Sequence, residues 1–284
     1  MNKIILGAIF QLGFLPFLFA GNENLPVGAR SGAMANASVT LTDVWSAHQN
    51  QAGLAWLKNP EASIYSEMKY LNKATSLNAV AFAMPTKQGV FALSVNRFGY
   101  SQYNESKVGL AFAKTFGEKF SLGAQFDYLN TYVGDNNGSK SGITMEIGFQ
   151  AKVTNALTIG GHLYNPTRTK LATYNNERVP TIFKLGIQYT FSDNVLAVAE
   201  IEKDIYNKPL VKLGVEYRII KSIYVRGGVS TNPVKSSFGV GAYYKSFKFD
   251  FSSSFHQQLG YSPAINISYV FNKTVAKNTP ASIN

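Results

Sequence analysis

Apolar and polar side chains alternate strictly along most of the chain. In the stretch GITMEIGFQAKV, which spans 142–153, the odd positions are apolar and the even positions are polar or glycine. Because successive side chains of a β-strand point to opposite faces, this pattern predicts a strand with two different neighbours. The same pattern recurs in KFSLGAQFDYL, TIFKLGIQYTF, LVKLGVEYRI, SFGVGAYYKSF and FKFDFSSSFH.

About fourteen such runs follow one another from position 62 onward. The predicted strands are 62–70, 76–85, 89–98, 105–116, 119–130, 142–153, 156–164, 180–191, 195–204, 209–219, 222–229, 236–245, 247–256 and 262–271. Many are about 10 residues long, the length that a tilted strand needs to cross a bilayer. Strands of soluble proteins peak at about 5–6 residues.

The connections between these runs supply a second test. Those after even-numbered strands are tight, whereas those after odd-numbered strands are longer, such as TYVGDNNGSK and NPTRTKLATYNNERV. Bacterial outer-membrane barrels have short periplasmic turns, longer extracellular loops and an even number of strands. We therefore expect an all-β fold, a transmembrane antiparallel β-barrel of about 14 strands over 61–271. Its apolar face meets lipid and its polar face lines the interior.

The two ends of the chain extend this prediction. The last run, INISYVF, ends on Phe271, as terminal strands of outer-membrane proteins do, and 272–284 is expected to be a flexible periplasmic tail. Residues 1–20 hold one lysine and an apolar run broken by Gln11, Gly13 and Pro16, and end on Ala20. That composition predicts a cleaved secretory signal peptide. An N-terminal membrane anchor is the alternative.

Composition agrees with a membrane barrel. Hydrophobic residues make up 45% and charged residues only 15% of the chain, against about a quarter charged in average soluble proteins. Without cysteine, disulfides and thiolate metal sites are excluded. The net charge of +11 could attract anionic lipid headgroups, but no Lys/Arg cluster occurs and we favour dispersed solubilising charge. Nucleic acid is not an expected partner.

Residues 21–60 break the alternation. They are rich in small side chains, and Thr42 and Asp43 resemble a helix start. Small side chains let backbones approach closely, and an unfilled wide barrel is a water channel. We therefore predict an N-terminal hatch folded into the lumen. A periplasmic extension that merely caps the first strand is the alternative.

The segment GARSGAMANASVTLTDVWSAHQNQAGLA resembles the N-terminal motif of PorV/PorQ-type proteins and of the wider FadL-like β-barrel superfamily. The matching positions are Gly28, Ala29, Arg30, Gly32, Met34, Ala35, Ala37, Asp43, Asn50, Ala52, Gly53 and Leu54. Gln51 stands where the family has proline. Of these, the resemblance marks Gly28, Arg30, Asp43, Asn50 and Gly53 as candidate ligand-binding or hatch residues.

The resemblance implies two functions. PorV/PorQ proteins serve type IX secretion by escorting or attaching exported proteins at the outer membrane. FadL proteins instead pass long-chain fatty acids and other hydrophobic small molecules through a side opening. The leading hypothesis is a non-enzymatic, PorV/PorQ-like component in the outer membrane of a Gram-negative, Bacteroidetes-type bacterium. The alternative is a FadL-like transporter. Outer-membrane lipid and either secretion-system proteins or a hydrophobic small molecule are the expected partners.

Catalytic chemistry is sparsely represented. His48, His162 and His256 are lone histidines without a nucleophile and carboxylate partner, so no catalytic residue, metal site or cofactor is predicted. Nine charges are expected in the lumen: Glu146, Lys152, Lys184, Glu200, Glu202, Lys212, Glu216, Arg218 and Arg226. Their mixed signs favour cross-strand pairs, with Lys212 or Lys184 matching Glu200 and Glu202. A selectivity filter is the alternative.

Overall fold

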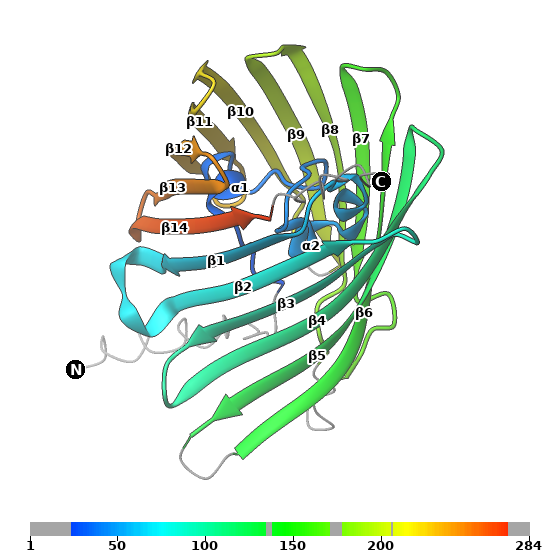
Figure 1. Cartoon of the computed structure of the whole chain (residues 1–284). Helices are drawn as coiled ribbons and strands as arrows, with labels where there is room; N and C mark the ends of the chain where they lie inside the picture. Colours follow the sequence, from blue (N-terminus) through cyan, green and yellow to red (C-terminus); the bar gives the residue numbers. More distant parts are fainter. Residues whose placement is uncertain (1–23, 135–137, 171–177, 206, 272–284) are drawn as a thin grey trace, which may run out of the picture.

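The computed structural model describes residues 24–134, 138–170, 178–205 and 207–271. These residues form a closed barrel of 14 antiparallel strands, each paired with its neighbours in sequence and sealed by pairing of the first strand with the last (Figure 1). The predicted fold class is confirmed. The predicted signal peptide and C-terminal tail lie outside the described residues.

The strands have the following bounds: β1 Glu61–Met68, β2 Ser76–Pro85, β3 Val90–Gly99, β4 Tyr103–Phe116, β5 Phe120–Val133, β6 Gly138–Lys152, β7 Leu157–Tyr164, β8 Ile182–Ser192, β9 Val195–Asp204, β10 Leu210–Ile220, β11 Ile223–Ser230, β12 Lys235–Tyr244, β13 Phe247–His256 and β14 Gly260–Val270. Short helices are α1 Ala29–Ala33, α2 Ser46–Gln49, η1 Gln51–Trp56, η2 Lys69–Leu71 and η3 Lys73–Thr75.

The two ends of the barrel differ in their connections, less sharply than predicted. We call the end with the connections after even-numbered strands the turn end, and the opposite end the loop end. At the turn end, Gly117 adopts a φ of 66°, which a tight turn requires and glycine tolerates. At the loop end, the β5–β6 ladder continues to the pair Val133–Gly138. The strands therefore absorb residues predicted to be loop, and connections 100–102 and 257–259 are as short as turns.

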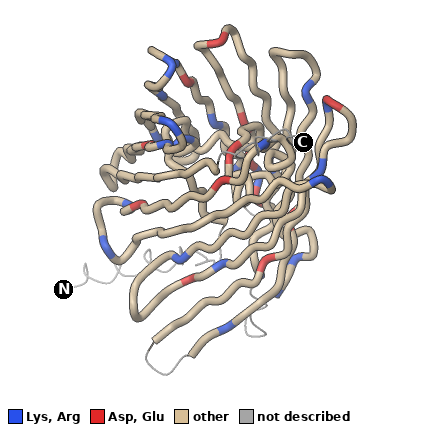
Figure 2. Tube along the Cα trace, viewed as in Figure 1, with Lys and Arg blue, Asp and Glu red and all other residues tan. Residues whose placement is uncertain are grey.

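The outer surface of the barrel is apolar. Outward-facing side chains include Phe126, Ile143 and Phe191, which are 65%, 69% and 66% exposed. A continuous apolar surface of this kind would be an aggregation surface in water, so it is the surface of a barrel solvated by lipid. Figure 2 shows how sparse charged residues are along the strands. No helix among the described residues is long and apolar enough to cross a membrane.

Residues 24–60, here called the N-terminal segment, run through the inside of the barrel (Figure 1). Helices α1, α2 and η1 belong to this segment, and almost every residue from 27 to 54 is buried. Helix α1 contacts β11–β14, whereas η1 contacts β3–β6. The segment thus fills the middle of the lumen and touches the wall on opposite sides.

A row of inward-facing glycines, which we call the glycine belt, receives the N-terminal segment. A Cβ at these positions would come within 3 Å of the segment's atoms, so only glycine permits the observed approach. The nearest is Gly148, where a Cβ would meet Asn50, and at Gly228 a Cβ would meet the backbone of Met34 and Ala35. The belt comprises Gly123, Gly148, Gly160, Gly186, Gly214, Gly228 and Gly239.

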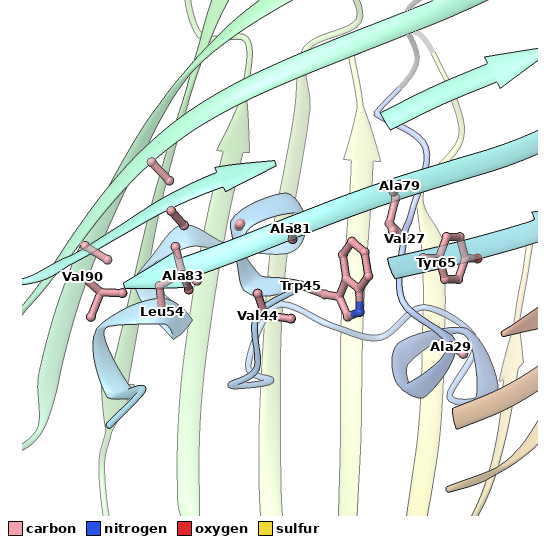
Figure 3. Close-up of a cluster of buried hydrophobic side chains, with 14 of the residues drawn as sticks. Val27, Ala29, Val44, Trp45, Leu54, Tyr65, Ala79, Ala81, Ala83 and Val90 are labelled. Atoms are coloured by element: carbon pink, nitrogen blue, oxygen red, sulfur yellow. The ribbon is translucent and has the colours of Figure 1, made fainter. Parts of the chain in front are cut away.

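The apolar side of the N-terminal segment packs against the inner wall of β1–β4. Val44, Trp45 and Leu54 of the segment lie against an inner wall made largely of alanine (Figure 3). We call this wall the alanine strip: Ala79, Ala81, Ala83, Ala92, Ala111 and Ala113. One side of the lumen is therefore apolar and is covered by the N-terminal segment.

Candidate functional site

Arg30 and Asp43 of the motif form part of one ion-pair group. Arg30 lies in α1 and donates two hydrogen bonds of 2.8 Å, from Nε and Nη2, to the carboxylate of Glu216 on β10. Its Nη1 lies 3.6 Å from Oδ2 of Asp43. The other oxygen of Asp43 accepts the N–H of Trp45 at 2.9 Å, so Asp43 precedes α2 rather than capping its first residue. Arg30 therefore joins the N-terminal segment to the wall.

The other three motif residues shape the segment itself. Gly28 has a φ of 107°, a conformation that disfavours any side chain, and a Cβ there would lie 3.2 Å from Trp45. Asn50 donates from Nδ2 to the carbonyls of Val39 and Phe149, at 2.6 and 3.1 Å, and its Oδ1 caps η1. A Cβ on Gly53 would lie 2.6 Å from the Leu41 carbonyl. These contacts fix the segment's shape and place no free ligand-binding atom in a cavity.

Glu146 is the centre of a first group of lumenal charges. Its side chain is completely buried and accepts hydrogen bonds from Lys107 Nζ at 2.7 Å and from Gln51 Nε2 at 2.7 Å. His162 Nε2 lies 2.8 Å from the second carboxylate oxygen. Lys107 also donates to Asn24 Oδ1 at 2.9 Å. Two wall charges thereby hold two residues of the N-terminal segment.

Glu200 anchors the middle of the segment. Its Oε2 accepts the backbone N–H groups of Ser38 and Val39 at 2.7 and 2.8 Å. Its other oxygen accepts from Lys212 Nζ at 2.9 Å, and Lys212 also donates to Glu202 at 2.7 Å. Lys184 lies 3.7 Å from Glu202. These contacts match the pairing expected for the two glutamates.

Glu216 and Arg226 form a third group, together with Arg30. Arg226 Nε donates to Glu216 at 2.6 Å, Nη1 to Asp250 at 2.7 Å and Nη2 to the Tyr243 hydroxyl at 2.9 Å. Two opposite charges therefore flank each member. In all three groups, charges of opposite sign pair with one another. This arrangement fits ion pairs that hold the wall and the segment together better than a selectivity filter, which usually has a ring of charges of one sign.

The last two sequence-predicted lumenal charges lie at the margins of the site. Lys152 Nζ lies 3.5 Å from the centre of the Trp56 ring, a cation–π contact with the end of η1. Arg218 is half-exposed near the turn end and donates to Asn194 Oδ1 at 3.1 Å, and it makes no hydrogen bond or ion pair with the described part of the N-terminal segment. Arg218 thus belongs to the rim.

Several lumenal residues were not predicted from the sequence. Lys107 is the most important, since it pairs with the most deeply buried carboxylate. Its position was readable, because alternation in 105–116 places it on the same face as Gly109, Ala111 and Ala113. Glu61, which pairs with Lys248 at 3.0 Å, stands at the predicted strand boundary, where alternation is least informative.

The buried histidines serve as packing and hydrogen-bonding groups. His48 is 2% exposed and its Nε2 lies 2.5 Å from Asn96 Nδ2. Burial, reinforced by the nearby Lys107 ammonium, lowers the pKa of His48 well below its ordinary value, so the imidazole is neutral at pH 7. Among the described residues, no group of three or more His, Asp or Glu could hold a metal ion.

Two polar cavities lie inside the barrel, with the N-terminal segment between them. The cavity at the loop end has about 270 Å³ and is lined by Lys235, Ser237 and Ser262 among others. The cavity at the turn end has about 150 Å³ and is lined by Arg30, Glu61 and Lys248 among others. Residues of the N-terminal segment line both cavities. Two larger apolar hollows, of about 370 and 630 Å³, lie on the outer surface of the described barrel.

Solved structures share this architecture. The toluene transporter TbuX of Ralstonia pickettii matches with a TM-score of 0.71 and 14% identity, over 86% of this chain and 98% of that one. The toluene transporter TodX of P. putida gives 0.69 and 11%, over 86% and 98%. A FadL homologue of Pseudomonas aeruginosa gives 0.62 and 13%, over 87% and 99%. A scan against models of protein families and a search of curated proteins gave no match.

The fold and the filled lumen together define the class. The chain is a membrane β-barrel with the fold of the FadL-like outer-membrane transporters, carrying its N-terminal segment inside. At these identities the likeness is one of fold. The resemblance to the wider FadL-like superfamily is supported at that level, and the resemblance to PorV/PorQ proteins specifically stays a prediction.

Proposed function

We propose that this chain is an outer-membrane transporter for hydrophobic small molecules, held closed by its N-terminal segment. The observation that carries the proposal is the alanine strip on β2–β4, an apolar inner wall covered by Val44, Trp45 and Leu54 of the segment. The neighbours' descriptions as toluene transporters and a monoaromatic hydrocarbon channel support it. Displacing those three side chains would leave an apolar path along the strip.

Closure in the present state follows from the contacts. The two cavities inside the described barrel are lined mostly by charged and polar side chains, so neither suits a hydrophobic molecule before the segment moves. The ladders from β1 to β4 are regular, without the strand kink expected for a side opening of the FadL type. The register shifts occur instead in β8 and β10, near the turn end. Movement of the N-terminal segment is therefore the step that the proposal requires.

A disulfide lock tests the proposal directly. A Cβ on Gly32 would lie 3.7 Å from the Ser252 Cβ, close to the usual separation of about 3.8 Å in a disulfide. The chain has no other cysteine, so Gly32→Cys with Ser252→Cys ties the segment to β13 and nowhere else. We expect the oxidised variant to take up labelled oleate no faster than protein-free liposomes do, and the reduced variant to exceed that background rate. Absence of uptake by the wild-type protein would refute transport.

A second candidate, a PorV/PorQ-like component of type IX secretion, is favoured by a different observation. Wall groups on β6, β9 and β10 bind the segment through Gln51, Ser38, Val39 and Arg30, as a fixed structural part would be bound. This candidate predicts normal secretion by the locked variant and a secretion defect on deletion. Wild-type secretion in a deletion strain would exclude it. Co-purification with secretion-system subunits would support it.

A further inference from the structure

The apolar band on the outside of β1–β6 ends at a polar row. Directly paired, outward-facing positions near the loop end are Ser66, Asn78, Arg97, Ser106, Asn130 and Ser141. The row immediately toward the turn end is Ile64, Val80, Val95, Val108, Tyr128 and Ile143. Paired residues on one face of a sheet lie side by side. The change from one row to the next therefore marks the boundary between hydrocarbon and headgroups.

A groove crosses this boundary on the outer surface of β14, β1, β2 and β3. It has a volume of about 370 Å³, and its exposed walls are the outward side chains Ile64, Val80, Val95, Ile265 and Ile267. Its polar end is formed by Ser66, Asn78 and Arg97. The groove is thus apolar along its length and carries one charged residue, Arg97, at the end nearest the polar row.

The polar end of the groove offers free donors. Arg97 is exposed, and its guanidinium has no partner among the residues that the structure describes. Asn78 Oδ1 accepts from the Ser66 hydroxyl at 2.9 Å, which leaves the amide Nδ2 without a partner in that same part of the chain. A guanidinium beside an amide N–H is suited to an oxyanion, because the planar fork donates parallel hydrogen bonds.

We propose that this groove is a binding site for lipid A, the phosphorylated glycolipid of the outer leaflet. An acyl chain lies along Ile64, Val80 and Val95, and a headgroup phosphate accepts hydrogen bonds from Arg97 and Asn78. The loop end faces outward in the orientation expected from the connections, so the polar row meets the outer leaflet. The site is independent of the lumen and therefore of what the barrel transports.

A second outer groove shows what distinguishes the first. It has about 630 Å³ and lies over β8–β11 between Tyr189, Phe191 and Leu213. Its lining contains no charged or amide side chain. The second groove is therefore larger and more apolar than the first, but its lining has no side chain that could bind a charged headgroup. We expect that groove to accept any acyl chain without preference.

Native mass spectrometry of the purified barrel, titrated with lipid A in detergent, tests the proposal. Loss of the charge-assisted hydrogen bonds from the guanidinium should weaken lipid A binding at least about tenfold for Arg97→Ala. Arg97→Lys should recover only part of this, since an ammonium cannot bind a phosphate through two parallel bonds. Val80→Trp, which fills the groove, should weaken binding with Arg97 intact.

Matched controls separate the site from general electrostatics. Lys114 also faces outward and is exposed, but lies near the turn end of β4, so Lys114→Ala should leave lipid A binding unchanged. Val108→Trp changes a residue of the same apolar row on β4, one strand beyond the groove, and should also leave lipid A binding unchanged. The proposal is overturned if Arg97→Ala binds lipid A like the wild type in a correctly folded, heat-modifiable barrel. Equal binding of phosphatidylethanolamine and lipid A would also overturn it.

Discussion

Arg30→Ala should release the N-terminal segment from the wall without unfolding the barrel. Arg30 makes two hydrogen bonds of 2.8 Å to Glu216, and the two side chains are 20% and 9% exposed. At about 1.5 kcal/mol for each charge-assisted bond the loss is about 3 kcal/mol. Breaking a buried ion pair costs about 3–5 kcal/mol, and the lower end applies because Arg226 still compensates Glu216.

That magnitude predicts an opening equilibrium of the segment about 100-fold larger, since each 1.4 kcal/mol is a factor of ten. Hydrogen–deuterium exchange of the detergent-solubilised protein measures it. The Ser38 and Val39 amides, which donate to Glu200, should exchange about 100-fold faster, and the amides of the β4–β5 ladder should not change.

Arg218→Ala is the matched control, because Arg218 lies on β10 two residues beyond Glu216 and its side chain bonds Asn194 rather than any described residue of the N-terminal segment. A double-mutant cycle of Arg30→Ala with Glu216→Gln should give a coupling of about 1–3 kcal/mol. Equal amide exchange in Arg30→Ala and Arg218→Ala would show that Arg30 does not hold the segment. Exchange of the strand ladders of Arg30→Ala as fast as that of the segment would show instead that the residue supports the whole barrel.

Three further outcomes are expected. Gly228→Ala places a Cβ 2.5 Å from the Met34 carbonyl carbon, whereas the nearest atom to a Cβ on the adjacent, outward-facing Gly227 is 3.9 Å away. Planar-bilayer conductance or protease cleavage of the segment should therefore rise for Gly228→Ala, through overpacking of about 1–3 kcal/mol, and not for Gly227→Ala. His48 has a lowered pKa, so the unfolded chain binds a proton that the folded one does not, and stability falls as pH drops below about 6.5. His48→Gln should flatten the decline in thermal midpoint between pH 7.5 and 5.5, and an unchanged slope would contradict the assignment. The mature protein should sediment with the outer-membrane fraction and need detergent for extraction; a monodisperse species in a detergent-free extract would contradict the lipid-facing surface.

The fold was predictable because a single periodicity carries it. Strict alternation in runs such as 142–153 and 183–191 places each residue on one of two faces, and the observed strands begin and end within a few residues of the predicted ones. Loop lengths were less predictable. The ladder between β5 and β6 continues beyond the point where alternation weakens, because backbone pairing does not require an apolar side chain.

The charged wall residues of the site can be predicted from the sequence, but the segment residues that they bind cannot. Alternation predicts Glu146, Glu200 and Glu216 on the polar face of their strands, but the segment residues that they bind come from a stretch without periodicity. Serine and valine backbone amides at 38 and 39 carry no sequence signal for a carboxylate. Arg97 was visible as the one charge on an otherwise apolar face in 89–98, although its groove requires β14 and β1 as neighbours.

The glycine belt has a consequence for how the protein comes together. The segment fits against the wall because the wall has glycine at the contact positions. Neither surface is therefore well packed without the other. The segment leads directly into β1, and β1 forms the seam with β14. We therefore expect insertion of the segment to precede closure of the seam during biogenesis. A chain without residues 24–57 would form a barrel with an empty lumen. Its wall has no side chains at the glycine belt, so it would lack the inward contacts that keep the barrel's diameter fixed.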